Sequence, residues 1–124
     1  IFLGAQADTS VWYQVMDVFV MPSLFEGLPV VGIEAQAAGL PCLFSDAVTD
    51  EVLLSGRAVR CSLNAPDTLW ARTALDAVQA PSDRAAGAAL VRQAGYDIVA
   101  ETAALQQRYL DLIEQRTAGG SRHA

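Results

Sequence analysis

The chain of 124 residues is long enough for one globular domain, and its hydrophobic content of 52% excludes wholesale disorder. Its formal net charge is -6, and its eight basic residues, all arginines, are scattered between Arg57 and Arg122. This pattern argues against nucleic acid or anionic lipid as a partner.

The sequence argues against a membrane span, a cysteine metal site and catalysis by histidine. No apolar run approaches the roughly 20 residues that span a bilayer, and the N-terminus lacks the basic flank of a signal peptide. We therefore expect no membrane span and a cytoplasmic location. Cys42 and Cys61 lie in apolar runs without metal-ligand spacing, so we expect buried free thiols. His123, the one histidine, lies in a Gly/Ser tail, which argues against base catalysis by imidazole.

Short apolar runs alternate with helical patterns along the chain, which predicts an α/β fold with a parallel sheet. The predicted strands are "IFLG" at 1–4, "DVFVMPS" at 17–23, "PCLFSD" at 41–46 and "AVRCSL" at 58–63. The predicted helices cover about 8–16, 29–38, 66–78, 82–94 and 97–116, with a short helical turn at 49–54. The helix at 29–38 has Pro29 at its start and Gly39 after its end, the usual asymmetry of helix termini.

These elements predict an incomplete Rossmann-like sheet of about four strands, flanked by helices and followed by a helical extension. We expect residues 1–95 to form this partial domain, 96–116 to be a helix packed on it, and 117–124 to be a disordered tail. The extension has one stripe of apolar positions spaced 4, 3, 4 and 3 residues apart, namely Ile98, Thr102, Leu105, Tyr109 and Leu112. Because fewer than three heptads are present, packing on the core is favoured over an intermolecular coiled coil.

The strand predicted at 17–23 would have an unpaired edge. In a Rossmann-like order of 3-2-1-4-5-6, it would border strands that this chain lacks. An open edge exposes unpaired N–H and C=O groups, which proteins rarely leave uncovered. We expect either that residues 1–4 pair with 17–23 as a fourth strand, or that another chain covers the edge and the protein forms a dimer.

The loop at 24–29 is predicted to cross the carboxyl edge of the sheet, where parallel α/β sheets bind ligands. Gly27 would permit close backbone approach by an anion. The amides of Gly27, Leu28 and Val30 are free of helical hydrogen bonds, because they precede or begin the helix. A phosphate group is therefore a plausible ligand at this helix N-terminus.

Two acids, Glu26 and Glu34, stand eight positions apart around this loop. Glu34 lies about 7.5 Å along the helix from Pro29 at 1.5 Å per residue, so it can accept hydrogen bonds from a diol such as ribose. Glu26 would then lie on the far side of the phosphates, near the sugar of a nucleotide sugar. Glu26 could instead stabilise the helix dipole, by roughly 0.3–1 kcal/mol. Glu34 lies in a helix that is apolar nearly all round, which predicts a buried carboxylate without a partner nearby in sequence.

The segment "DVFVMPSLFEGLPVVGIEAQAAGLPCLFSD" resembles the donor-binding segment of family 4 retaining glycosyltransferases, whose E-x7-E motif Glu26 and Glu34 match in spacing. The resemblance implies a two-domain B-type fold without a catalytic metal or other cofactor, of which this chain is part of the C-terminal, nucleotide-sugar-binding domain. It also implies that Glu34 binds the ribose and that Glu26 is catalytic, near the anomeric carbon of the donor sugar. The amides of Gly27 and Leu28 would support the sugar and the diphosphate.

The implied reaction moves a hexosyl unit from a nucleotide sugar to a polysaccharide or glycolipid hydroxyl, with the acceptor held by the N-terminal domain. Family members usually place an Arg and a Lys upstream of this segment, whereas this chain has no Lys and no Arg before Arg57. We therefore expect the chain alone to be inactive. Two alternatives remain: a nucleotide-sugar epimerase of the same fold, and a module that binds a nucleotide sugar without catalysis.

Overall fold

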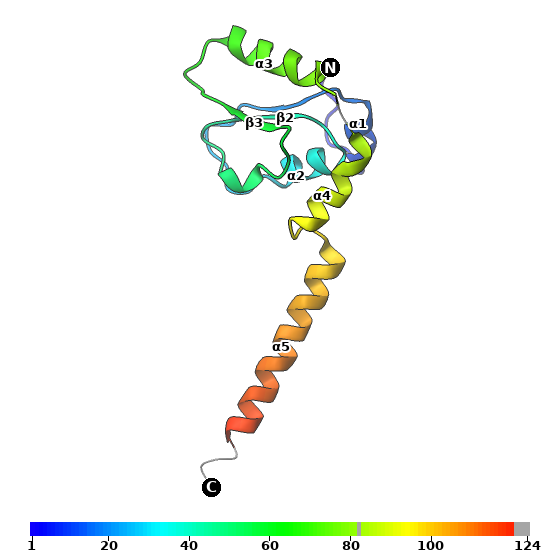
Figure 1. Ribbon diagram of the computed structural model, residues 1–124, viewed down its shortest axis with the longest axis vertical. Helices are drawn as coiled ribbons and strands as arrows, with labels where there is room; N and C mark the ends of the chain where they lie inside the picture. The colour runs from blue at the N-terminus through cyan, green and yellow to red at the C-terminus, as the bar shows by residue number, and fades with distance from the viewer. Residues whose placement is uncertain (82, 121–124) are drawn as a thin grey trace. The chain divides into compact units, whose positions relative to one another are not determined.

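The structure is a computed structural model that describes residues 1–81 and 83–120, without the side chains of 118–120. It divides into two units, Ile1–Ala94 and Gly95–Ala124, which are described separately. The first unit contains the sheet and its helices, and the second contains one long helix, α5 (Ile98–Gly120) (Figure 1).

The sheet has three parallel strands in the order β1-β2-β3. They are β1 (Phe19–Met21), β2 (Cys42–Ser45) and β3 (Ala58–Cys61), which lie within three of the four predicted strands. Helix α2 (Val30–Ala37) connects β1 to β2, and the short 3-10 helix η1 (Asp50–Val52) lies between β2 and β3. The predicted α/β class with a parallel, Rossmann-like sheet is therefore confirmed.

The expected fourth strand is absent from the described residues, so the prediction of about four strands, with residues 1–4 paired to β1, is wrong. Ile1 and Phe2 are fully exposed, and Gly4 has a φ of 65°, a left-handed conformation that interrupts an extended strand. A strand this short gains too little without a ladder to offset the entropy of ordering its backbone. The alternative, a second chain on the edge of β1, stays a prediction.

One face of the sheet carries the main core. Phe19 of β1 and Phe44 of β2 point to this face, with ring centroids 6.1 Å apart. Helix α2 packs closely here because it has Gly32 over the Phe44 ring: a Cβ on Gly32 would lie 2.8 Å from Phe44 Cε1. Phe44 is fully buried as a result.

Helix α3 (Asp67–Gln79) lies on the opposite side of the sheet from α2 (Figure 1) but covers this face only in part, since none of its residues is buried. Val20, Leu43 and Val59 are register partners across the three strands and therefore share this face. Trp70 of α3 donates its indole N–H to the Ser62 carbonyl at 3.0 Å, just beyond β3. The first unit thus has three layers, with α2 and α3 on opposite sides of the sheet.

Helix α2 ends against the segment that leads into α4 (Gly87–Gln93). Gly39 follows α2 with a φ of 72°, and a Cβ there would lie 2.4 Å from the Arg84 backbone. A Cβ on Gly87 would lie 2.5 Å from the Gln36 carbonyl oxygen. Both glycines are therefore required by close backbone contact between α2 and the η2–α4 segment, where η2 is Arg84–Ala86.

Arg84 joins these elements to the first helix, α1 (Ser10–Val15). Its guanidinium donates to the carbonyls of Tyr13 at 2.7 Å, Met16 at 3.0 Å and Ala38 at 3.3 Å. These carbonyls lie at the C-terminal ends of α1 and α2, where cations interact favourably with the helix dipole. One side chain thus holds two helices in a fixed relation.

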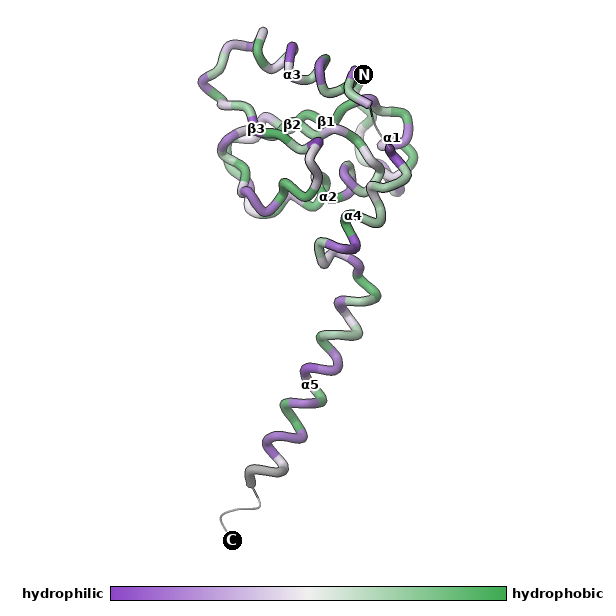
Figure 2. Tube along the Cα trace, viewed as in Figure 1, coloured by the Kyte–Doolittle hydropathy of each residue, from purple (hydrophilic) through white to green (hydrophobic). Residues whose placement is uncertain are grey.

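The second unit begins with a capped helix. Asp97 Oδ1 accepts hydrogen bonds from the amides of Val99 at 3.0 Å and Ala100 at 3.2 Å. Helix α5 begins at Ile98, one residue after the predicted start, and continues to Gly120, into the range predicted as a tail. Residues 121–124 of that tail lie outside the described residues. Hydrophobic and hydrophilic stretches alternate along α5 (Figure 2), and its packing on the first unit stays a prediction. No helix among the described residues is long and apolar enough to cross a membrane.

Candidate functional site

The loop after β1 places Glu26 at the carboxyl edge of the sheet, as predicted from the sequence. Pro22 has no N–H to continue the strand ladder, so β1 ends at Met21. The half-buried Glu26 then accepts a hydrogen bond from the Ser23 hydroxyl at 3.2 Å. Ser45, at the end of β2, donates its own hydroxyl to the Ser23 carbonyl. The carboxyl ends of two neighbouring strands therefore hold the segment that carries Glu26.

The backbone between Glu26 and α2 is open to solvent. Gly27 and Leu28 are exposed, and a Cβ added to Gly27 would meet no atom within 4 Å. Neither packing nor a left-handed φ requires glycine at this position. Val30 begins α2, where first-turn amides have no intrahelical acceptor. Gly27, Leu28 and Val30, whose amides are predicted to face an anion, are thus all exposed residues.

Glu34 is exposed, so the prediction of a buried carboxylate without a partner is wrong. Helix α2 buries only one side, formed by Gly32, Ile33, Ala35 and Gln36. Val30 and Val31 on its other side are 65% and 41% exposed, which shows that apolar composition overstated the coverage of this helix. Glu34 also has a partner: its Oε2 accepts a hydrogen bond from the Tyr13 hydroxyl at 2.9 Å.

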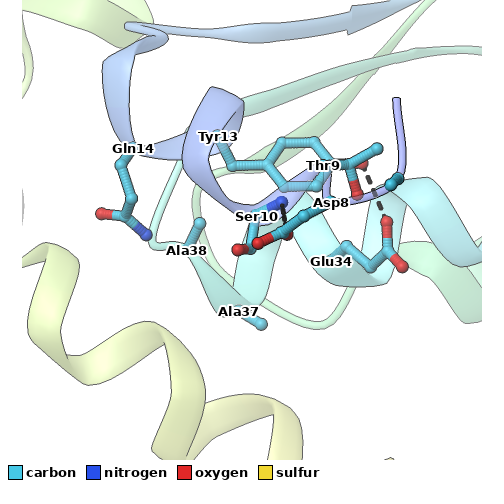
Figure 3. Close-up of a pocket in the computed structure, with 9 residues that line it drawn as sticks. Asp8, Thr9, Ser10, Tyr13, Gln14, Glu34, Ala37 and Ala38 are labelled. Atoms are coloured by element: carbon cyan, nitrogen blue, oxygen red, sulfur yellow. Dashed lines mark hydrogen bonds between the residues drawn. The ribbon is translucent and has the colours of Figure 1, made fainter. Parts of the chain in front are cut away.

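Glu34 lines a pocket of about 440 Å³ between α1 and α2, here named the α1–α2 pocket (Figure 3). Its lining consists of Ala7, Asp8, Thr9, Ser10, Tyr13, Gln14, Glu34, Ala37 and Ala38. At the start of α1, Asp8 Oδ1 accepts a hydrogen bond from the Ser10 amide at 2.8 Å. Hydrogen bonds from the side chain and backbone of Ser10 lower the pKa of Asp8. The pocket thus offers two carboxylates and no basic side chain.

The other predicted site residues, Glu26, Gly27, Leu28 and Val30, are not part of this lining. The structure therefore distributes the predicted site over two places: the β1–α2 loop with Glu26, and the α1–α2 pocket with Glu34. A ligand that used both glutamates would have to extend from the pocket past the N-terminus of α2. A nucleoside diphosphate sugar has such an extended form, with base, ribose, phosphates and sugar in a row.

Sequence reasoning missed Tyr13. Tyr13 is 7% exposed, and its pKa is raised to about 12 by burial and by the hydrogen bond and charge of Glu34. The hydroxyl is therefore protonated and able to donate at neutral pH. A signal was present: consecutive helices on one face of a parallel sheet are neighbours, and Tyr13 lies in the helix that precedes β1.

Both cysteines are free and buried, as predicted. Burial raises the pKa of Cys42 to about 12, which makes its thiol a poor nucleophile at neutral pH. Among the described residues no group of three or more His, Cys, Asp or Glu side chains is arranged to hold a metal ion.

Comparison with known proteins identifies the class. The family described as "Glycosyl transferases group 1" matches residues 1–79. The chain therefore belongs to this glycosyltransferase family, which confirms the resemblance to family 4 enzymes seen in its sequence. No solved structure gives a significant match.

Bacterial glycosyltransferases are among the relatives. The chain is 50% identical over 74 residues to EpsF of Bacillus subtilis (strain 168), which is provisionally named a glycosyltransferase; the match covers 59% of this chain and 19% of EpsF. It is 39% identical over 72 residues to N,N'-diacetylbacillosaminyl-diphospho-undecaprenol alpha-1,3-N-acetylgalactosaminyltransferase of Campylobacter jejuni, covering 58% of this chain and 17% of that protein.

A third relative is UDP-Gal:alpha-D-GlcNAc-diphosphoundecaprenol alpha-1,3-galactosyltransferase of Escherichia coli, 46% identical over 46 residues. This match covers 37% of the present chain and 12% of the relative. In these three comparisons the chain spans between 12% and 19% of the length of its relatives. It corresponds to a small part of such a protein.

Proposed function

We propose that this chain is the donor-binding part of a retaining glycosyltransferase that moves a hexosyl unit from a nucleotide sugar to a hydroxyl of a polysaccharide or glycolipid. The match of residues 1–79 to the family carries the proposal. Two relatives named above act, by their names, on undecaprenol-linked diphosphates, which supports a lipid-linked or saccharide acceptor.

In the proposed reaction, the bond between the anomeric carbon and the β-phosphate oxygen breaks, and the acceptor oxygen bonds to that carbon on the same face. The acceptor proton passes to the leaving diphosphate, so no oxidant or reductant is needed. The transition state has an oxocarbenium-like sugar and a departing dianion. Glu26 would stabilise the sugar, while the free amides of Gly27, Leu28 and Val30 would stabilise the dianion.

Glu34 would bind the ribose from the α1–α2 pocket. Its exposed position at the pocket wall supports this role, because a buried carboxylate could not reach a ligand. The diphosphate would be neutralised by basic groups of the parent protein outside this chain, and we propose that no metal ion takes part. The acceptor would bind to an N-terminal domain of the parent.

The test uses the full-length parent protein, supplied with UDP- and GDP-hexoses and an undecaprenol-diphosphate-linked sugar. We expect a new glycoside in the mass spectrum, with the anomeric configuration of the donor in the NMR spectrum, and undiminished activity in EDTA. Epimer interconversion without acceptor would indicate the epimerase alternative, and donor binding without turnover would indicate a binding module. Fractionation of cells that express the parent would test the proposed cytoplasmic location.

A further inference from the structure

The Glu34 side chain would be mobile if nothing held it. An exposed glutamate on a helix populates several rotamers, and fixing such a side chain costs up to about 1.5–2 kcal/mol. A carboxylate that must meet two ribose hydroxyls at once therefore binds better when its orientation is set beforehand. In this structure the Tyr13 hydroxyl supplies a fixed donor, 2.9 Å from Glu34 Oε2 (Figure 3).

Tyr13 is itself held on several sides. It is buried in the core, and its ring makes an edge-on contact with the Phe19 ring of β1 at a centroid distance of 6.4 Å. Its backbone carbonyl accepts a hydrogen bond from the Arg84 guanidinium at 2.7 Å. The hydroxyl position is therefore set by the sheet and by η2 rather than by the exposed surface of α2.

The contact leaves Glu34 able to bind a ligand. An ionised carboxylate has about four acceptor sites, and Tyr13 takes one of them on Oε2. Among the described residues no other hydrogen bond to the Glu34 carboxylate is found, so Oε1 and the second site of Oε2 remain for hydroxyl donors in the pocket. The Tyr13 hydroxyl is protonated at neutral pH, as a tyrosine is even at its ordinary pKa of about 10, and burial together with Glu34 raises this pKa further, to about 12.

We propose that Tyr13 is a positioning residue for donor binding, whose hydroxyl holds the Glu34 carboxylate in the orientation that receives the ribose hydroxyls. This inference rests on the proposed function, because it assigns the ribose of a nucleoside diphosphate to Glu34. In this role Tyr13 acts through Glu34, by holding its carboxylate.

A double-mutant cycle in the full-length parent tests the proposal, with UDP and GDP as calorimetric probes. Tyr13→Phe should weaken binding of the preferred nucleotide about 3- to 10-fold, the range for loss of one hydrogen bond. Glu34→Ala should weaken it at least as much. Adding Tyr13→Phe to Glu34→Ala should change affinity less than twofold, because the hydroxyl then has no carboxylate to hold.

Tyr96→Phe is the matched control, because it removes the same hydroxyl in the second unit, outside the pocket lining; it should leave affinity unchanged. A Tyr13 that only stabilises the fold would lower the melting temperature while nucleotide affinity stayed the same, or would weaken binding equally with and without Glu34. Either result overturns the role of Tyr13. Failure of the wild-type parent to bind any nucleoside diphosphate would instead overturn the proposed function, and the role of Tyr13 with it.

Discussion

Glu26 and Glu34 are held by different kinds of contact, and this difference separates their proposed roles. Glu26 accepts a hydrogen bond from the hydroxyl of Ser23 in its own loop, at 3.2 Å, whereas Glu34 accepts one from Tyr13 in another helix. Because Ser45 of β2 donates a hydrogen bond to the Ser23 carbonyl, the segment that carries Glu26 is anchored to the sheet. A carboxylate held in place in this way is suited to stabilise charge that develops during the proposed reaction.

Replacing Glu26 with alanine should reduce turnover more than nucleotide affinity. We expect Glu26→Ala in the parent to lower kcat about 100-fold, the order found for loss of one electrostatic group, with UDP or GDP affinity within about twofold of wild type. Steady-state kinetics and calorimetry measure the two quantities. Glu51→Ala, which removes an exposed glutamate of η1, serves as the control and should change neither. Equal losses in kcat and affinity would reduce Glu26 to a partner of the helix dipole.

At this scale the sequence predicted where both glutamates stand but not what surrounds Glu34. Spacing along one helix is a local property, so the position of Glu34 relative to Pro29 could be worked out. Its exposure and its bond to Tyr13 depend on how α1 packs beside α2, which joins residues 21 positions apart. Local periodicity contains no such information.

At the level of elements, helix α2 ends at a glycine in the left-handed conformation, and the sequence indicated this end. Gly39 was expected after the helix, and its φ of 72° fits the left-handed residue that ends many helices. The tight contact of Gly39 with Arg84, 45 residues later in the chain, could not be predicted in the same way. It arises because η2 and α4 pack onto the end of α2.

Gly39→Ala should therefore destabilise the fold strongly. A left-handed alanine costs roughly 1–2 kcal/mol, and a Cβ only 2.4 Å from Arg84 adds the roughly 1–3 kcal/mol typical of overpacking. We expect a loss of about 2–5 kcal/mol, measured by denaturant unfolding of the parent and seen in the transition of this domain. Gly56→Ala adds a Cβ where no atom lies within 4 Å and should change stability by less than about 0.5 kcal/mol. Similar effects of both changes would show that the Arg84 contact is absent in solution.

For the whole molecule, the number of strands is where sequence reasoning failed. The three strands found lie between α2 and α3 on opposite sides of the sheet, and their apolar runs could be recognised locally. "IFLG" has the same apolar character, yet residues 1–4 form no strand, because a strand also needs a neighbour with matching hydrogen bonds. The apolar pattern of a segment predicts which of its side chains face the core. It does not predict whether a neighbouring strand is present to pair with its backbone.

The edge of β1 leads to a prediction about assembly. β1 pairs with β2 on one side only, and Val20 at its centre is 44% exposed. An open strand edge, with its unpaired backbone N–H and C=O groups, is a template for another strand. In a twofold dimer, β1 of one copy would pair antiparallel with β1 of the other and give a continuous six-stranded sheet.

We expect the 124-residue chain, expressed without the rest of its parent, to form such a dimer in sedimentation equilibrium. Val20→Lys should shift it to monomer, because a charged side chain at the centre of an edge strand opposes pairing. Val59→Lys makes the same change on β3, the other edge of the sheet, where the side chain is 37% exposed, and should leave the dimer intact. A wild-type chain that is monomeric at every concentration, or a dimer lost only with Val59→Lys, would show that the β1 edge is not the contact surface.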